Sequence, residues 1–212
     1  MASIGSLQGD LTVQGNLTVT GEYRPAIART ALLQESLSPF PVRMTDWKVW
    51  NAMQTNLPTT PATDDLGMVH GTFATGSPSL QTEDLKAEAG NPTLKYARAQ
   101  IPLPMNYVAG QTVVLRIHCG MITTAADDTC TIDVSAYESD GEAGISADLC
   151  ATAAVSMNST DFADKDFTIT ATTLNPGDML DVRVLITVSD GATGTAVIGC
   201  IGAVTLLCDT KG

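Results

Sequence analysis

Apolar residues occupy every second position in three stretches of the second half of the chain. In residues 112–121 they are Val113, Leu115, Ile117 and Cys119; in residues 130–137 they are Cys130, Ile132, Val134 and Ala136; in residues 178–188 they are Leu180, Val182, Val184, Ile186 and Val188. A period of two places these side chains on one face of a β-strand and the intervening residues on the other. We therefore expect three strands, each with one buried face.

Further short β-branched runs lie at residues 68–75, 94–103, 155–157 and 167–170, separated by turn-forming residues. The apolar run 195–208 has no polar face, which is typical of a strand covered on both sides or at a subunit interface. Residues 175–178, Asn-Pro-Gly-Asp, fit a type II turn, because glycine adopts the positive φ that its third position requires. About eight antiparallel strands predict an all-β, jelly-roll-like β-sandwich over residues 63–212.

Residues 22–62 lack this alternation and contain both tryptophans of the chain, Trp47 and Trp50. Residues 26–37 follow Pro25, which suits the first position of a helix. Thr45 would cap a second short helix that presents both indoles on one side, with a strand as the alternative. We expect a partly helical connector here and a short helix in the loop 82–90. The indoles either pack within the chain or contact another subunit.

The first 21 residues contain a six-residue repeat, GDLTVQGNLTVTG, at residues 9–21. Leu11 and Leu17 hold equivalent positions in it, as do Val13 and Val19. Two units bury too little surface to offset roughly 1–2 kcal/mol of backbone entropy per residue. We therefore expect residues 1–21 to form a β arm that other copies of the chain complete, with a simple hairpin turning at Gly15 and Asn16 as the alternative.

Composition and charge restrict the partners. Charged residues make up only 16% of the 212 residues and hydrophobic ones 44%, so part of the surface is expected to be covered in an oligomer. A net charge of −12 repels phosphate backbones, which argues against nucleic acid. The apolar run 195–208 is shorter than the roughly 20 residues of a membrane span, so no membrane insertion is expected. The amino terminus lacks signal-peptide features, which suggests synthesis in a cytoplasm.

Candidate chemistry is sparse. The two histidines, His70 and His118, have no metal-binding spacing, and no G-x-S-x-G motif is present, so we expect no enzyme and no cofactor. The five cysteines lack C-x-x-C spacing and are expected to be buried thiols. Acidic stretches at residues 127–128, 138–142 and 161–166 are expected to be solvated loops, with a calcium site as a weaker alternative.

The repeat at residues 9–21 resembles those at the amino ends of bacteriophage fibre, spike and head-decoration proteins. Residues 101–121 and 175–207 resemble the jelly-roll domains of virion surface proteins. The resemblance implies a trimeric virion component that attaches to capsid or tail through its amino-terminal part, while the sandwich projects outward.

Two functions follow as hypotheses. The first is a non-enzymatic homotrimer that decorates and stabilises a capsid, as a cement or head-fibre protein located on the virion surface. Its partners would be the major capsid protein or another virion protein, and its assembly and attachment residues would be Leu11, Val13, Leu17, Val19, Trp47 and Trp50. The alternative is the receptor- or carbohydrate-binding tip of a phage tail fibre, which would bind a host surface glycan. A polysaccharide-cleaving spike is a third hypothesis.

Overall fold

The computed structural model describes residues 37–61, 63–86, 92–123, 129–139, 141, 144–190 and 196–211. Their elements are β1 Ser38–Val42, a 3-10 turn Met44–Asp46, β2 Gly67–Val69, β3 Ser79–Gln81, β4 Thr93–Pro102, β5 Val113–Met121, β6 Thr129–Ser139, β7 Val155–Ser156, β8 Ala163–Ile169, β9 Met179–Ser189 and β10 Gly199–Cys208. The six-residue repeat and most of the expected helix at 26–37 lie outside the described residues, so both stay predictions.

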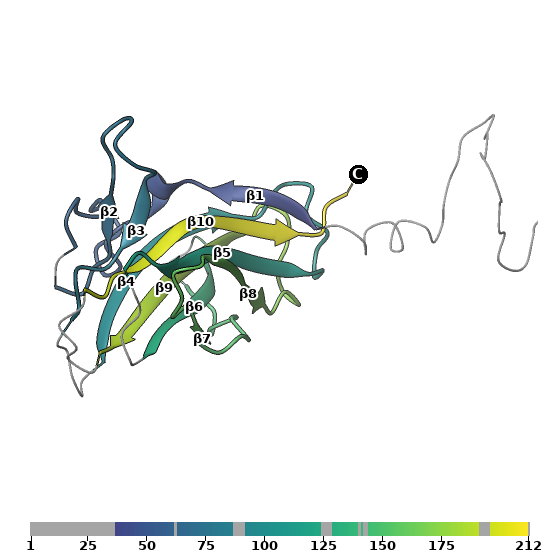
Figure 1. Cartoon of the computed structure of the whole chain (residues 1–212). Helices are drawn as coiled ribbons and strands as arrows, with labels where there is room; N and C mark the ends of the chain where they lie inside the picture. Colours follow the sequence, from purple (N-terminus) through teal and green to yellow (C-terminus); the bar gives the residue numbers. More distant parts are fainter. Residues whose placement is uncertain are drawn as a thin grey trace, which may run out of the picture. The chain divides into compact units, whose positions relative to one another are not determined.

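The strands form two antiparallel sheets packed face to face (Figure 1). The six-stranded sheet has the order β2-β3-β10-β5-β8, with β1 also paired to β10, and the four-stranded sheet has the order β4-β9-β6-β7. The pairs β3–β10, β4–β9, β5–β8 and β6–β7 are nested in the sequence, as in one long hairpin folded over itself. This nesting is the jelly-roll arrangement, and the predicted fold class is therefore confirmed.

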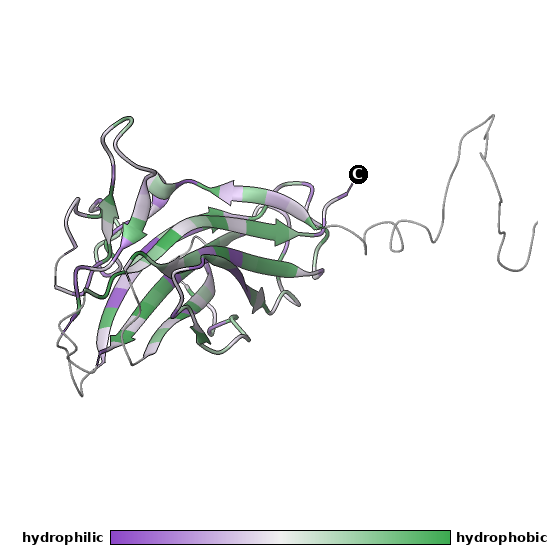
Figure 2. Ribbon diagram, in the orientation of Figure 1, coloured by the Kyte–Doolittle hydropathy of each residue, from purple (hydrophilic) through white to green (hydrophobic). Residues whose placement is uncertain are grey.

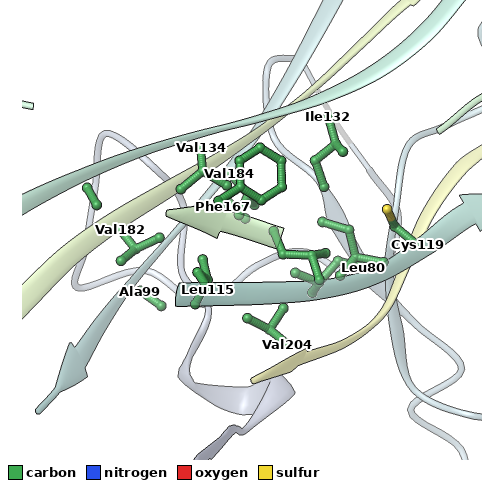
Figure 3. Close-up of a cluster of buried hydrophobic side chains, with 14 of the residues drawn as sticks. Leu80, Ala99, Leu115, Cys119, Ile132, Val134, Phe167, Val182, Val184 and Val204 are labelled. Carbon is green, nitrogen blue, oxygen red and sulfur yellow. The ribbon is translucent and has the colours of Figure 1, made fainter. Parts of the chain in front are cut away.

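The core lies between the sheets and comes from the alternating positions that the sequence identifies. Along the strands of Figure 2, hydrophobic and hydrophilic residues alternate, with β10 the most uniformly hydrophobic. Figure 3 shows side chains of both sheets meeting around Phe167 of β8; the others labelled there are Leu80, Ala99, Leu115, Cys119, Ile132, Val134, Val182, Val184 and Val204, all buried. The predicted inward faces of β5, β6 and β9 are thus confirmed.

The apolar run at the end of the chain forms β10, which is paired along both edges. Its carboxyl-terminal half lies between β1 and β5, and its first residues lie between β3 and β5. The register with β5 shifts between Ile201 and Ala203, and this bulge brings Ile201 and Val204, three residues apart, into the core together. Consecutive residues are buried at both ends of β10, at Cys200–Ile201 and Leu206–Cys208, so both faces are covered there and a polar face is missing.

Residues 37–61 differ from the expected helical connector. Ser38–Val42 form β1, which pairs with Val204–Cys208 of β10. Thr45 lies within the 3-10 turn Met44–Asp46 and caps no helix, because Trp47 is extended and Lys48 pairs with Arg98 of β4. Pairing with a distant strand thus overrides the local helix signal. The described residues from Ser38 onward belong to the sandwich.

Two other expectations are corrected by backbone geometry. The strand expected at 68–75 ends at Val69, since His70 has a φ of 64°, which a strand does not accommodate. Residues 82–85 are not helical: the Thr82 and Leu85 amides donate hydrogen bonds to the carbonyls of Gly199 and Val197 and extend the pairing of β3. The type II turn is confirmed, with Gly177 at φ +86° and a 3.2 Å hydrogen bond from Asp178 N to Asn175 O.

All five cysteines are free thiols, as expected. Four are buried, and Cys150 is half-buried. Burial raises the pKa of Cys130 to about 12 and those of Cys119 and Cys208 to about 11. These thiols act as core side chains, protonated at neutral pH. No helix in the described part of the chain has the length and apolar character of a membrane span.

Candidate functional site

The outer face of the four-stranded sheet carries a group of aromatic and charged side chains. Alternation along β4 directs Tyr96 and Arg98 outward, and the same alternation along β9 directs Asp181 and Arg183 outward. The register places Arg98 opposite Arg183, and places Tyr137 of β6 opposite Asp181. Side chains from three adjacent strands therefore form one surface, which we call the aromatic face: Trp50, Tyr96, Arg98, Tyr137, Asp181 and Arg183.

Trp50 reaches this face from the segment that runs along β4. The amide of Lys48 donates to the Arg98 carbonyl at 2.8 Å, and the Arg98 amide donates back at 3.0 Å. This pairing leaves Trp47 fully buried in the core, while Trp50 is half-buried beside Tyr96. The ring centroids of Trp50 and Tyr96 are 4.8 Å apart and their planes are inclined by 38°. The two tryptophans thus lie in different environments, not on one helix face.

Arg98 and Asp181 form a fixed ion pair on the aromatic face. Arg98 Nε donates to Asp181 Oδ1 at 2.6 Å, and Arg98 Nη2 donates to Asp181 Oδ2, so the two planar groups are joined by two parallel hydrogen bonds. These bonds raise the pKa of Arg98 above its ordinary value. The Asp181 carboxylate is almost entirely buried. The pair therefore offers fixed polar edges to a ligand.

Arg183 takes a different set of partners from its neighbour Arg98. Like charges directly opposite each other in a sheet repel, and Arg98 is satisfied by Asp181. The Arg183 guanidinium lies over the rings, with Cζ 5.3 Å from the Tyr96 centroid and 6.0 Å from that of Trp50. Its Nη2 donates to Ser135 Oγ at 3.0 Å. Cation–π contacts and this hydrogen bond hold the guanidinium in a fixed orientation.

The aromatic face, apart from Tyr96, borders a surface hollow of about 280 Å³. Its lining consists of Trp50, Asn51, Arg98, Tyr137, Ile145, Asp181 and Arg183. Two other hollows among the described residues, of about 400 and 460 Å³, are larger, but neither is lined by an ion pair or by two aromatic side chains. Apolar walls with a few oriented polar groups are typical of a site that binds a small or extended ligand.

The described lining supports binding chemistry better than hydrolysis. Cleavage of a glycoside generally requires two carboxyl groups flanking the bond. Asp181 supplies the one carboxylate among the described lining residues, and Arg98 occupies both of its oxygens. Among the described residues, no group of three or more His, Cys, Asp or Glu side chains is placed to hold a metal ion.

The assembly and attachment residues expected from the sequence lie in different parts of the chain's structure. Leu11, Val13, Leu17 and Val19 lie outside the described residues. Trp47 is buried, so its indole offers no surface to another subunit. Trp50 lies on the aromatic face, and a subunit contact through it stays a prediction.

The acidic stretch 161–166 is only partly a loop. Asp164 and Asp166 lie on β8 and pair with His118 and Arg116 of β5. Residues 127–128, 140 and 142 of the other acidic stretches lie outside the described residues. Glu138 of the stretch 138–142 lies half-buried on β6 and accepts a 3.0 Å hydrogen bond from Thr173 Oγ1, so the expectation of solvated loops is wrong for Glu138, Asp164 and Asp166.

Sequence reasoning missed Tyr96, Arg98 and Arg183 as site residues. Alternation gives the outward direction of Asp181 and Arg183, but it does not give the strand that lies beside them. Arg98 and Asp181 are 83 residues apart in the chain. One signal was available in the sequence. Aromatic and arginine side chains occupy outward positions of strands that otherwise contain few charged residues, and such side chains are candidates for a binding surface.

No family model and no curated protein matches the sequence. Solved structures with a similar fold include the xylan-binding module CBM15 (TM-score 0.42, 13% identity, 83% of this chain and 99% of that chain covered). The CBM22-2 xylan-binding domain of Xyn10C from Paenibacillus barcinonensis gives a TM-score of 0.41 at 12% identity, with 78% and 93% covered. TmCBM61, solved with β-1,4-galactotriose, gives 0.37 at 8%, with 64% and 74% covered. Such values assign neither family nor ligand, and the virion resemblance stays a prediction.

Proposed function

We propose that this protein is a non-catalytic carbohydrate-binding domain whose ligand lies on the aromatic face. The observation that carries the proposal is a surface hollow lined by Trp50, which packs on Tyr96, by Tyr137 and by the Arg98–Asp181 ion pair. This function corresponds to the second hypothesis from the sequence, a carbohydrate-binding tip, and places the binding surface on the face of a sheet.

The rings suit one side of a sugar. A pyranose ring has faces of C–H groups, which pack on indole and phenol rings because these bury a large, rigid apolar area at low entropic cost. Trp50 is half-buried and lines the hollow, and Tyr96 supports it from the side at a centroid distance of 4.8 Å. Tyr137 and Ile145 extend the lining on the other side of the ion pair.

The polar groups suit the rim of a sugar. Vicinal hydroxyl groups both donate and accept hydrogen bonds, and they match planar groups whose donors and acceptors are fixed in advance. Arg98, Asp181 and Arg183 are held by one another, by Ser135 and by the rings, so little side-chain entropy is lost when a ligand binds. Asn51, at the exposed end of the hollow, adds an amide.

Tryptophan fluorescence tests this proposal directly. The buried Trp47 contributes a constant signal, so emission that changes on titration with oligosaccharides reports Trp50. We expect a panel of purified oligosaccharides to include ligands that shift this emission. For such a ligand, Trp50→Ala should lower the affinity at least about fivefold, as measured by calorimetry, because stacking on an aromatic ring contributes on the order of 1 kcal/mol or more.

Phe73 provides the matched control. Its ring is 97% exposed in the loop between β2 and β3, so Phe73→Ala removes an aromatic side chain without touching the hollow. We expect this variant to bind as the unmodified chain does. A panel without a single ligand, or equal affinity in the Trp50→Ala and Phe73→Ala variants, would refute the proposal.

The biological setting of this binding stays a prediction. The partner we propose for the aromatic face is a glycan; that it belongs to a host surface, and that the protein lies on a virion, comes from the sequence resemblance alone. The homotrimer and the capsid partner gain no support from the described residues.

A further inference from the structure

The charge of the hollow differs from that of the chain around it. The protein carries a net charge of −12, yet the charged groups that line the hollow are Arg98, Arg183 and the single carboxylate of Asp181. Asp181 compensates Arg98 through two hydrogen bonds. Arg183 therefore leaves one uncompensated positive charge on the described lining, a local potential that favours an anionic ligand.

Arg183 is also incompletely satisfied as a hydrogen-bond donor. A guanidinium has five N–H groups, and the described partner is the Ser135 hydroxyl at 3.0 Å. Arg183 Nε is shielded from solvent and has no hydrogen-bond partner among the described residues. No carboxylate of the described residues pairs with this guanidinium. Because Nε is enclosed, a ligand would meet the Nη groups of Arg183, whose N–H donors the Ser135 contact uses only in part.

Acidic groups elsewhere on this face do not serve Arg183. Asp133 of β6 also faces outward, but it lies opposite Leu185, and its Oδ1 accepts a 2.9 Å hydrogen bond from the Val134 amide. Asp148 accepts hydrogen bonds from the amides of Ala136 and Cys150. Both carboxylates therefore bond to backbone amides in the described structure.

We infer that the glycan bound on the aromatic face is acidic, with a sugar carboxylate paired to Arg183. This inference rests on the proposed function and adds the class of ligand. The rings of Tyr96 and Trp50 hold one face of the guanidinium, which leaves its N–H edge for a planar acceptor. A carboxylate matches this edge, and its neighbouring pyranose rings would pack on the aromatic side chains.

The experiment compares ligands that differ in one charge. A panel of neutral, uronate-containing and sialate-containing oligosaccharides is titrated against the intact chain, which separates the two sources of a sugar carboxylate. The acidic ligands are then converted to methyl esters, which keep the rings and remove the charge. We expect the panel's ligands to be acidic and esterification to weaken binding at least about tenfold, the effect of one charged hydrogen-bonded contact.

Variants assign the effect to Arg183. Arg183→Gln should abolish the difference between acid and ester, whereas Arg183→Lys should retain part of it, since it keeps the charge but not the planar fork. Arg116→Gln removes an arginine from the opposite sheet and should leave the difference intact. If Arg183→Gln proves unstable in thermal unfolding, the acid and ester comparison on the intact chain decides the matter.

The outcomes separate this inference from the proposed function. Binding of neutral glycans that depends on Trp50 but not on Arg183 would overturn the acidic ligand and leave the carbohydrate-binding function standing. Equal binding of an acid and its ester by the intact chain would overturn it as well. Failure of every glycan class to bind would overturn both.

Discussion

The two outer faces of the sandwich each carry an arginine and an aspartate joined by two parallel hydrogen bonds, but the two pairs are buried to different extents. On the six-stranded sheet, Arg116 Nε and Nη2 donate to Asp166 at 2.7 and 2.8 Å, and the side chains are 42% and 47% exposed. On the four-stranded sheet, Arg98 and Asp181 are 31% and 7% exposed. Pairing chemistry alone therefore does not distinguish a surface ion pair from part of a site.

The neighbours of the two pairs differ as much as their burial does. Near Arg116, the exposed His118 contacts Asp164 at 2.8 Å, and its ring centroid lies 5.8 Å from that of Phe162. Near Arg98, two rings and a second arginine surround the ion pair and leave a hollow. The first arrangement gives a solvated charged surface, and the second gives a rigid, partly apolar one. Burial of the polar groups makes the second face suited to recognition.

The largest expected difference between the faces is in stability. Asp181→Asn removes the charge that balances Arg98 in a half-buried setting, so we expect the free energy of unfolding to fall by about 1.5–3 kcal/mol. Asp166→Asn makes the same change on the exposed face, where water replaces the lost partner, and should lower the free energy of unfolding only slightly. Urea unfolding followed by tryptophan fluorescence measures both. Equal losses in the two variants would show that burial does not separate the pairs.

A smaller effect tests the stacking of Arg183 on the rings. In a double-mutant cycle of Tyr96→Leu and Arg183→Gln, we expect a coupling of about 0.5–1 kcal/mol, as for a cation–π contact near a surface. The control cycle combines Tyr96→Leu with Arg116→Gln on the opposite sheet, and its two effects should add. Additive effects in the first cycle would mean that the contact between Arg183 and the Tyr96 ring does not contribute to the free energy of unfolding.

Much of the sandwich can be predicted from period-two alternation, because a strand with one buried face has apolar residues at every second position. The inward residues of β5, β6 and β9 were predicted on that basis and are buried. Lys95 shows the limit of the rule: it lies inward on β4, buried, with its ammonium bonded to Glu83 at 2.6 Å and to the Thr63 carbonyl. A charged inward position is tolerated only because these distant partners satisfy it.

The site was less predictable than the fold, because it depends on which strands are neighbours. Trp50 reaches the aromatic face through the pairing of Lys48 with Arg98, a long-range contact that the spacing of the two tryptophans does not reveal. The opposition of Arg98 and Arg183 likewise follows from the register of β4 and β9. The sequence identifies the outward residues of each strand separately, whereas a binding surface is formed by outward residues of several neighbouring strands.

The smallest expected effect is the response of the exposed ion pair to acid. The hydrogen bonds from Arg116 hold the pKa of Asp166 below the ordinary value of about 3.9 for an aspartate. The unfolded chain therefore takes up this proton at a higher pH than the folded chain, so the contribution of the pair is complete above the ordinary pKa and is lost as the pH falls through the folded one. Arg116→Gln should lower Tm slightly at pH 6 and not at all near pH 2, measured by thermal unfolding at matched ionic strength. A difference that grows toward low pH would reverse the assigned sign, and the exposed pair would then not be a stabilising contact of the six-stranded face.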